Sequence, residues 1–132
     1  MTRIAAPVPD PAADEVVIFH NPACTTSRKV LALIRDAGIE PRVVDYQKTP
    51  PDSALLKRLA ERGGMAVRDL LRKKGTPYAE LGLGDVTLGD EALLAAIAKH
   101  PNLLERPLVA TATGAAICRP IERVLALLKD AK

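Results

Sequence analysis

One cysteine, Cys24, is the residue of this chain best placed for chemistry. It lies in the run His20-Asn21-Pro22-Ala23-Cys24-Thr25-Thr26-Ser27-Arg28, between the apolar stretch 16–19 and an amphipathic segment that starts at Ser27. A strand followed by a short loop and a helix would place this thiol at the helix N-terminus. Free backbone N–H groups and the helix dipole favour a thiolate and a bound anion there, so the run predicts thiol chemistry.

Ser27 narrows the kind of thiol chemistry. It stands three residues after Cys24, where a second cysteine would complete a disulfide motif at the start of the helix. No disulfide can form within this motif, so an oxidised or substrate-bound Cys24 needs an external thiol to release it by exchange. The alternative interpretation is a buried structural cysteine with no reactivity.

The apolar pattern predicts a βαβ unit around the cysteine. A strand over 15–19 is followed by a helix over 26–37 that ends at Gly38. A second strand over 42–46 follows a turn at Glu40-Pro41, and the two strands are expected to be parallel.

Helical segments are expected next, followed by a hairpin and a last helix. The first predicted elements are a helix from its cap Asp52 to Gly63, a shorter helical segment around 67–73, and a loop over 75–89 with a helical turn near 78–81. A helix over 91–100 capped by Asp90 comes next, followed by two strands within 107–111 and 115–118. The last predicted helix starts at Pro120, and its inward-facing residues are Ile121, Val124, Leu125 and Leu128. The order βαβ, helical insertion, ββα is that of an α/β, thioredoxin-like fold with a mixed central sheet. We expect one domain over 15–132 and a flexible N-terminal extension over 1–14, which is rich in Pro and Ala.

Composition limits the function classes. The 132 residues carry a net charge of +3 and include one Phe, two Tyr and no Trp, so the chain offers little for nucleic-acid binding. No apolar run is long enough to cross a bilayer, and the first residues lack the apolar segment of a signal peptide. We therefore expect a cytoplasmic protein without nucleic-acid or membrane partners.

The loop around Cys24 resembles the active-site loop of the glutaredoxin-dependent bacterial arsenate reductases. Further matches to that family follow in order along residues 15 to 128: Tyr46-Gln47-Lys48-Thr49-Pro50-Pro51, Val67-Arg68-Asp69-Leu70-Leu71-Arg72-Lys73, Pro77-Tyr78-Ala79-Glu80-Leu81-Gly82-Leu83, His100-Pro101-Asn102-Leu103-Leu104-Glu105-Arg106-Pro107 and Cys118-Arg119-Pro120. Two departures are Thr25, where the best-known members have glycine, and the hairpin segment 110–114, which lacks a proline common there.

The resemblance implies a function and a set of site residues. Cys24 would be the nucleophile that attacks arsenate, and Arg72, Arg106 and Arg119 would hold the oxyanion against it. Several guanidinium groups suit a doubly charged tetrahedral anion because each presents a rigid fork of donors. Glutathione and a glutaredoxin would act as external reductants, with no bound cofactor or metal. Taken singly, each arginine has another interpretation, as part of a solvated helix face or a surface ion pair.

Supporting roles fall to His20, Asn21, Thr26 and Ser27. The His20 ring is expected either to help hold the thiolate or to serve the loop structure, and the other three either donate hydrogen bonds to the sulfur or the oxyanion or cap the helix. By resemblance, Pro107 is the cis-proline that thioredoxin-like folds place opposite the active-site loop.

Other interpretations remain open at the level of sequence. One is a non-enzymatic redox regulator of the same family, although Ser27 removes the local disulfide that such sensing uses. Another is a thiol oxidoreductase acting on a different oxyanion or on glutathione adducts. Cys118 is expected to be a packed thiol, with a role as resolving partner for Cys24 as the alternative. A zinc site made of His20, Cys24, His100 and Cys118 lacks the paired short spacings of such sites.

Overall fold

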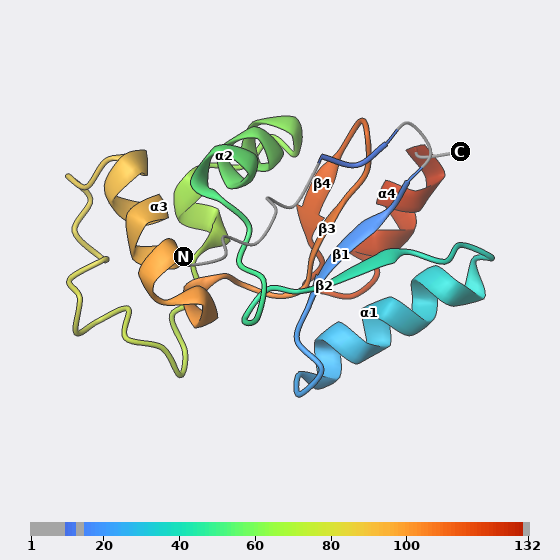
Figure 1. Ribbon diagram of the computed structural model, residues 1–132, viewed down its shortest axis with the longest axis horizontal. Coiled ribbons are helices and arrows are strands. Elements are labelled where there is room, and N and C mark those ends of the chain that lie inside the picture. Colours follow the sequence, from blue (N-terminus) through green and yellow to red (C-terminus); the bar gives the residue numbers. More distant parts are fainter. Residues whose placement is uncertain (1–9, 13–14, 131–132) are drawn as a thin grey trace, which may run out of the picture.

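A four-stranded mixed sheet forms the centre of the protein. The structure is a computed structural model that describes residues 10–12 and 15–130 (Figure 1). The strands lie in the order β2-β1-β3-β4, with bounds β1 Val17–His20, β2 Arg42–Asp45, β3 Leu108–Ala110 and β4 Ala115–Ile117. β1 runs parallel to β2 and antiparallel to β3, and β3 and β4 form an antiparallel hairpin. The predicted α/β fold with a mixed sheet is confirmed.

Helices pack against both faces of this sheet. Helices α1 (Thr25–Asp36) and α4 (Arg123–Asp130) contact each other beside the sheet. The insertion consists of α2 (Ser53–Arg62), the short 3-10 helix η1 (Val67–Leu70), α3 (Asp90–Lys99) and the 3-10 helix η2 (Pro101–Leu103). Figure 1 shows the insertion in green to orange on the left, and the sheet with α1 and α4 on the right.

Two apolar cores result from the alternation of side chains along the strands. Ile18 of β1 joins the smaller core with α1 and α4, where Val30, Ile34 and Val124 are fully buried. Phe19, its neighbour, joins the larger core formed with α2, α3 and the 3-10 helices. One strand therefore connects both cores and ends at the cysteine loop.

Local signals in the sequence explain where several helices begin and end. Asp52 Oδ1 accepts a hydrogen bond of 2.7 Å from the backbone N–H of Leu55, which makes it the predicted N-cap of α2. Gly38 has a φ of +83° just after α1, a conformation that costs glycine little. Both boundaries were predicted from residue type.

The last helix differs from its prediction. It begins at Arg123, and residues 120–122 form turns instead of its first turn. The start lies three residues later than expected, and the buried positions are Val124, Leu127 and Leu128. Leu125 is 49% exposed, so its predicted inward orientation was wrong.

Smaller corrections concern the insertion. Gly89 is the N-cap of α3, and Asp90, predicted as the cap, is its first residue, where its carboxylate still favours the helix dipole. The segment predicted around 67–73 ends as a helix at Leu70, because Leu71 pairs with Leu104 in an isolated antiparallel bridge. The turn of helix predicted near 78–81 is present as a single turn: Leu81 N donates to Pro77 O at 2.9 Å, which is the i→i−4 bond of an α-helix, and residues 77–84 do not continue as a longer helix.

Part of the predicted N-terminal extension contacts the domain. Residues 10–12 are described, and the Asp10 carboxylate lies 3.2 Å from Arg58 Nε and 3.8 Å from an Arg62 guanidinium nitrogen on α2. The prediction of flexibility for residues 1–9, 13 and 14 lies outside the described residues. In the described part of the chain, no helix is long and apolar enough to span a membrane.

Candidate active site

Cys24 is the N-cap residue of α1, as the sequence predicted. Its backbone is extended, its carbonyl accepts the N–H of Arg28 at 3.0 Å, and its own N–H donates to the Asn21 carbonyl at 2.9 Å. The thiol is partly exposed and forms no disulfide. The turn after β1 therefore presents this sulfur at the end of the helix that carries unpaired N–H groups.

The surroundings of Cys24 favour its ionised form. Burial raises the pKa of the thiol, but hydrogen bonding from the backbone N–H of Ser27, from the Arg106 side chain and from the backbone N–H of Thr26 outweighs it. The charge of Arg106 acts in the same direction, and the pKa of Cys24 is lowered below its ordinary value. Because the thiolate is the nucleophile, this is the setting of a reactive cysteine.

A buried hydrogen-bond network holds the cysteine loop in shape. Ser27 Oγ lies 2.6 Å from His20 Nδ1 and accepts the backbone N–H of Asn21 at 3.1 Å. Asn21 Oδ1 accepts the N–H of Ala23 at 3.0 Å. Burial lowers the pKa of His20, which keeps its ring neutral near pH 7. Of the two predicted roles for His20, the contacts favour the structural one, and Thr26 and Ser27 act on the sulfur through their backbone.

Three chain segments that are distant in sequence bring the predicted arginines together. Segment 70–72 pairs with 103–105: Arg72 N donates to Leu103 O at 2.6 Å, and Glu105 N donates to Leu70 O at 2.7 Å. Arg119 Nη1 donates to the Arg106 carbonyl at 3.1 Å, which joins the end of β4 to the start of β3. Arg72, Arg106 and Arg119 therefore lie in neighbouring segments.

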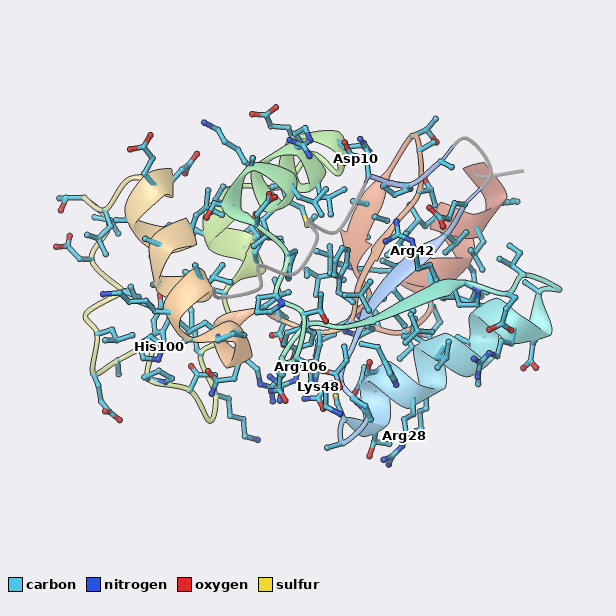
Figure 2. The ribbon with its side chains drawn as sticks, in the orientation of Figure 1. Asp10, Arg28, Arg42, Lys48, His100 and Arg106 are labelled. Atoms are coloured by element: carbon cyan, nitrogen blue, oxygen red, sulfur yellow. The ribbon has the colours of Figure 1, made fainter. Side chains whose placement is uncertain are left out.

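Arg106 is the arginine that acts directly on the thiol. Its Nη1 donates to the Asn102 carbonyl at 3.4 Å, while its Nε is buried and has no hydrogen-bond partner among the described residues. Figure 2 shows Arg106 near the middle of the molecule, where the helical insertion meets the sheet. An unpaired guanidinium N–H beside a thiolate is a donor available to an anion.

Arg72 and Arg119 line an open pocket next to this arginine. The pocket is lined by Leu71, Arg72, Lys73, Lys74, Glu105 and Arg119. Arg72 is engaged, since its Nη1 lies 2.8 Å from Glu105 Oε1 and its Nε donates to the Lys74 carbonyl at 3.1 Å. Glu105 therefore neutralises part of the positive charge that the resemblance predicts for the site.

Two residues of this region were missed as site residues. Glu105 lies between Leu104 and Arg106 in the segment 100–107, where the resemblance predicts only the arginine as a site residue. Tyr46 directly follows β2, at the end of the sheet where the carboxyl ends of β1 and β2 lie together. Its side chain is fully buried. The register pairs His20 with Asp45, so the residues that follow them, Asn21 and Tyr46, are neighbours just beyond the carboxyl ends of the two strands. Parallel strands place functional groups at their carboxyl ends, and that rule would have identified Tyr46.

The remaining predictions concern Cys118, Pro107 and metals. Cys118 is buried, and burial raises the pKa of its thiol to about 12, as suits the predicted packed thiol. The Arg106-Pro107 peptide is cis as predicted, and Arg119-Pro120 is cis as well. Within residues 10–12 and 15–130, no group of three or more His, Cys, Asp or Glu side chains is placed to hold a metal ion, so nothing there supports the zinc interpretation.

Comparisons with known proteins agree on one family. The sequence model of the ArsC family matches residues 19–127. The chain is 54% identical over 115 residues to an arsenate reductase of Rhizobium meliloti (strain 1021), covering 87% of this chain and 82% of the relative. It is 45% identical over 117 residues to an arsenate reductase of Escherichia coli (strain K12), covering 89% and 83%. A solved structure of an arsenate reductase from Vibrio cholerae superposes with a TM-score of 0.82 at 48% identity, covering 86% of this chain and 98% of that one.

Proposed function

The chain belongs to the ArsC family, and from this premise we propose that it reduces arsenate to arsenite with Cys24 as the nucleophile. The observation that carries the proposal is the position of Cys24 at the N-terminus of α1, beside the N–H groups of Ser27 and Thr26 and the Arg106 guanidinium. These groups favour both a thiolate and a neighbouring anion. The names of the relatives supply the anion, which is arsenate.

In the first step, the Cys24 thiolate attacks the arsenic atom. A sulfur–arsenic bond forms, and one arsenic–oxygen bond breaks so that its oxygen leaves as water after protonation. In this proposal Arg106 donates to the remaining oxygens through its Nε, which is buried and has no partner in the described part of the protein. The product is a thiol–arsenate adduct in which arsenic is still pentavalent.

Arg72 and Arg119 complete the anion site in this proposal. The Arg72 guanidinium already holds the Glu105 carboxylate at 2.8 Å, so the arsenate oxygens take up its other N–H groups or displace that carboxylate. Arg119 lines the same pocket as Arg72 and is fixed to the Arg106 carbonyl. Fixed guanidinium forks recognise oxyanions better than flexible ammonium groups do.

External thiols supply the two electrons. Glutathione attacks the arsenic of the Cys24 adduct and a second water leaves. A glutaredoxin thiol then attacks the glutathione sulfur, so that a mixed disulfide leaves and two electrons pass to arsenic, and one water hydrolyses the remaining sulfur–arsenic bond to release arsenite and the Cys24 thiol. The balance is arsenic acid plus two thiols giving arsenous acid, one mixed disulfide and water. The scheme needs no bound cofactor or metal. Ser27 supports this scheme because it leaves no second thiol in the loop, and a pool of reduced thiols fits a cytoplasmic location.

A coupled assay tests the proposal. Arsenate-dependent oxidation of NADPH is followed with glutathione, glutathione reductase and glutaredoxin, for the wild type, Cys24→Ser and Cys118→Ser. We expect turnover with the wild type, none above background with Cys24→Ser, and most of the activity with Cys118→Ser. Absence of wild-type turnover contradicts the assigned reaction. Equal loss in both cysteine variants contradicts the external-thiol mechanism.

The arginines are tested separately. Arg72→Ala, Arg106→Ala and Arg119→Ala remove one fork each, and we expect each to weaken arsenate binding, measured as a higher KM in the same assay. Arg35→Ala is the matched control. Arg35 is exposed on α1, pairs with Glu40 at 3.0 Å and does not line the pocket that contains Arg72 and Arg119. A KM for arsenate that rises equally with Arg35→Ala would contradict the assignment.

A further inference from the structure

Tyr46 has a buried hydroxyl group that the fold does not use. Its side chain is 0% exposed and lies in the larger core. Among the described residues, the buried side-chain polar atoms without a hydrogen-bond partner are Tyr46 Oη and Arg106 Nε. A buried polar group without a partner costs stability, so its presence in a core demands a reason.

Both unpaired groups belong to the surroundings of Cys24. The pKa of Tyr46 is raised, chiefly by burial, while the charges of Arg106 and Arg72 lower it and that of Cys24 raises it. The Tyr46 hydroxyl therefore interacts electrostatically with the Cys24 thiolate and with two of the three predicted anion-binding arginines. The Asn21 side chain also lies near the hydroxyl and favours its ionised form, but does not form a hydrogen bond of ordinary geometry with it.

The chemistry of the two unpaired groups matches an anion. Arg106 Nε can only donate, and a tyrosine that stays protonated also offers a donor without adding negative charge. The oxygens of a tetrahedral oxyanion accept hydrogen bonds. The strand order explains why Tyr46 lies near the cysteine loop. Tyr46 follows β2 and the loop follows β1, so both lie at the carboxyl ends of the same parallel pair.

We propose that the Tyr46 hydroxyl donates a hydrogen bond to the arsenate held between Cys24 and Arg106, which makes Tyr46 a fourth substrate-binding side chain. This inference rests on the proposed function. It adds a neutral donor to a site otherwise described by its cations. It also gives a reason for the unpaired hydroxyl, which is satisfied only when the substrate is bound.

The test measures arsenate binding without turnover. Iodoacetamide alkylates Cys24, and the arsenate concentration that protects it gives a dissociation constant for the wild type, Tyr46→Phe and Tyr78→Phe. We expect Tyr46→Phe to bind arsenate about 10- to 100-fold more weakly, the effect of losing a hydrogen bond to a charged group. Tyr78→Phe is the matched control, because Tyr78 is partly exposed with its ring beside Lys73, and we expect no change there.

Two further readouts separate substrate binding from other roles. Without arsenate, the pH dependence of alkylation should be the same in Tyr46→Phe and wild type, because the hydroxyl acts on the anion. The melting temperature should not fall, because the lost hydroxyl had no partner. Binding within twofold of the wild type, a shifted alkylation profile, or a lowered melting temperature accompanying the loss of binding would each overturn the inference.

A spectroscopic measurement keeps the test independent of the Tyr46 variant. The chain has two tyrosines and no tryptophan, so in Tyr78→Phe the tyrosine absorbance comes from Tyr46 alone. Saturating arsenate should produce a tyrosine difference spectrum in that variant, and absence of one overturns the inference. If arsenate fails to protect the wild type, the proposed function itself fails, and this inference with it.

Discussion

Replacing Arg106 should change the ionisation of Cys24 before any substrate is present. Arg106→Gln keeps a long polar side chain but removes the positive charge and the guanidinium donor beside the sulfur. An opposite charge within about 4–6 Å lowers a pKa by about 1–3 units, and the partial exposure of Cys24 favours the lower end. We expect the midpoint of thiolate formation to rise by about one pH unit in Arg106→Gln.

The rate of alkylation by iodoacetamide, measured from pH 4 to pH 10 without arsenate, gives this midpoint. The sign follows from the thiolate being the reactive form. Below both midpoints, Arg106→Gln has about tenfold less thiolate than the wild type. Each thiolate is about threefold more reactive because the sulfur is more basic, so the alkylation rate of the variant should be about threefold lower. Above both midpoints, the variant should react about threefold faster than the wild type. The two curves should therefore cross.

Arg72→Gln is the control that makes this prediction specific. Arg72 already pairs with Glu105 at 2.8 Å and is not among the groups that lower the pKa of Cys24. Its substitution should weaken arsenate binding and leave the alkylation midpoint within about 0.3 pH units of the wild type. Curves for Arg106→Gln and wild type that coincide would refute the reasoning, as would an equal rise in Arg72→Gln.

Three other substitutions test the frame around the site. Ser27→Ala removes a buried hydroxyl that serves a histidine ring and a backbone N–H, and should lower the free energy of unfolding in urea by about 1–3 kcal/mol; an unchanged unfolding midpoint would contradict the network. Asp52→Ala removes the cap of α2 and should cost about 1 kcal/mol in the same assay, whereas Asp52→Asn should retain most of the stability. Cys118 should not react with Ellman's reagent in the native protein because burial raises its pKa to about 12, so one thiol should be titrated before unfolding and two after it; two fast thiols in the native state would show that Cys118 is accessible.

Much of the fold follows from local patterns in the sequence. The apolar run before Cys24, the amphipathic segment after it and the glycine at 38 are sufficient to predict β1, α1 and their connection. The Thr113-Gly114 turn likewise predicts the hairpin of β3 and β4. These signals act over a few residues, and the structure preserves them.

The structure differs from the sequence-based predictions where contacts between distant parts of the chain determine the local structure. The last helix buries Leu127 and exposes Leu125 because its packing against α1, which is distant in the sequence, decides which of its positions face the core. Likewise, the pairing of Arg72 with Glu105 depends on the bridge between Leu71 and Leu104, and no periodic pattern predicts such a bridge.

The site itself was predicted in part by residue type and in part by resemblance. The position of Cys24 followed from the strand and helix around it. The three arginines came from the resemblance alone, since nothing local distinguishes them from the other basic residues of the chain. The position of Tyr46 after β2, at the carboxyl end of a parallel strand pair, was a signal in the sequence, whereas the burial of its hydroxyl and the missing partner could be known only from the structure.

Strand β1 contributes to both cores and leads into the cysteine loop, and this has a consequence for how the proposed activity would be lost. Cys24 is held by α1 on the side of the smaller core, whereas Arg72 follows η1 on the side of the larger core. The proposed site would be complete only while both cores are intact. Heat or urea should therefore abolish turnover as soon as the less stable core unfolds. Hydrogen exchange at the amides of each core would identify which core unfolds first and so determines the temperature or urea concentration at which activity is lost.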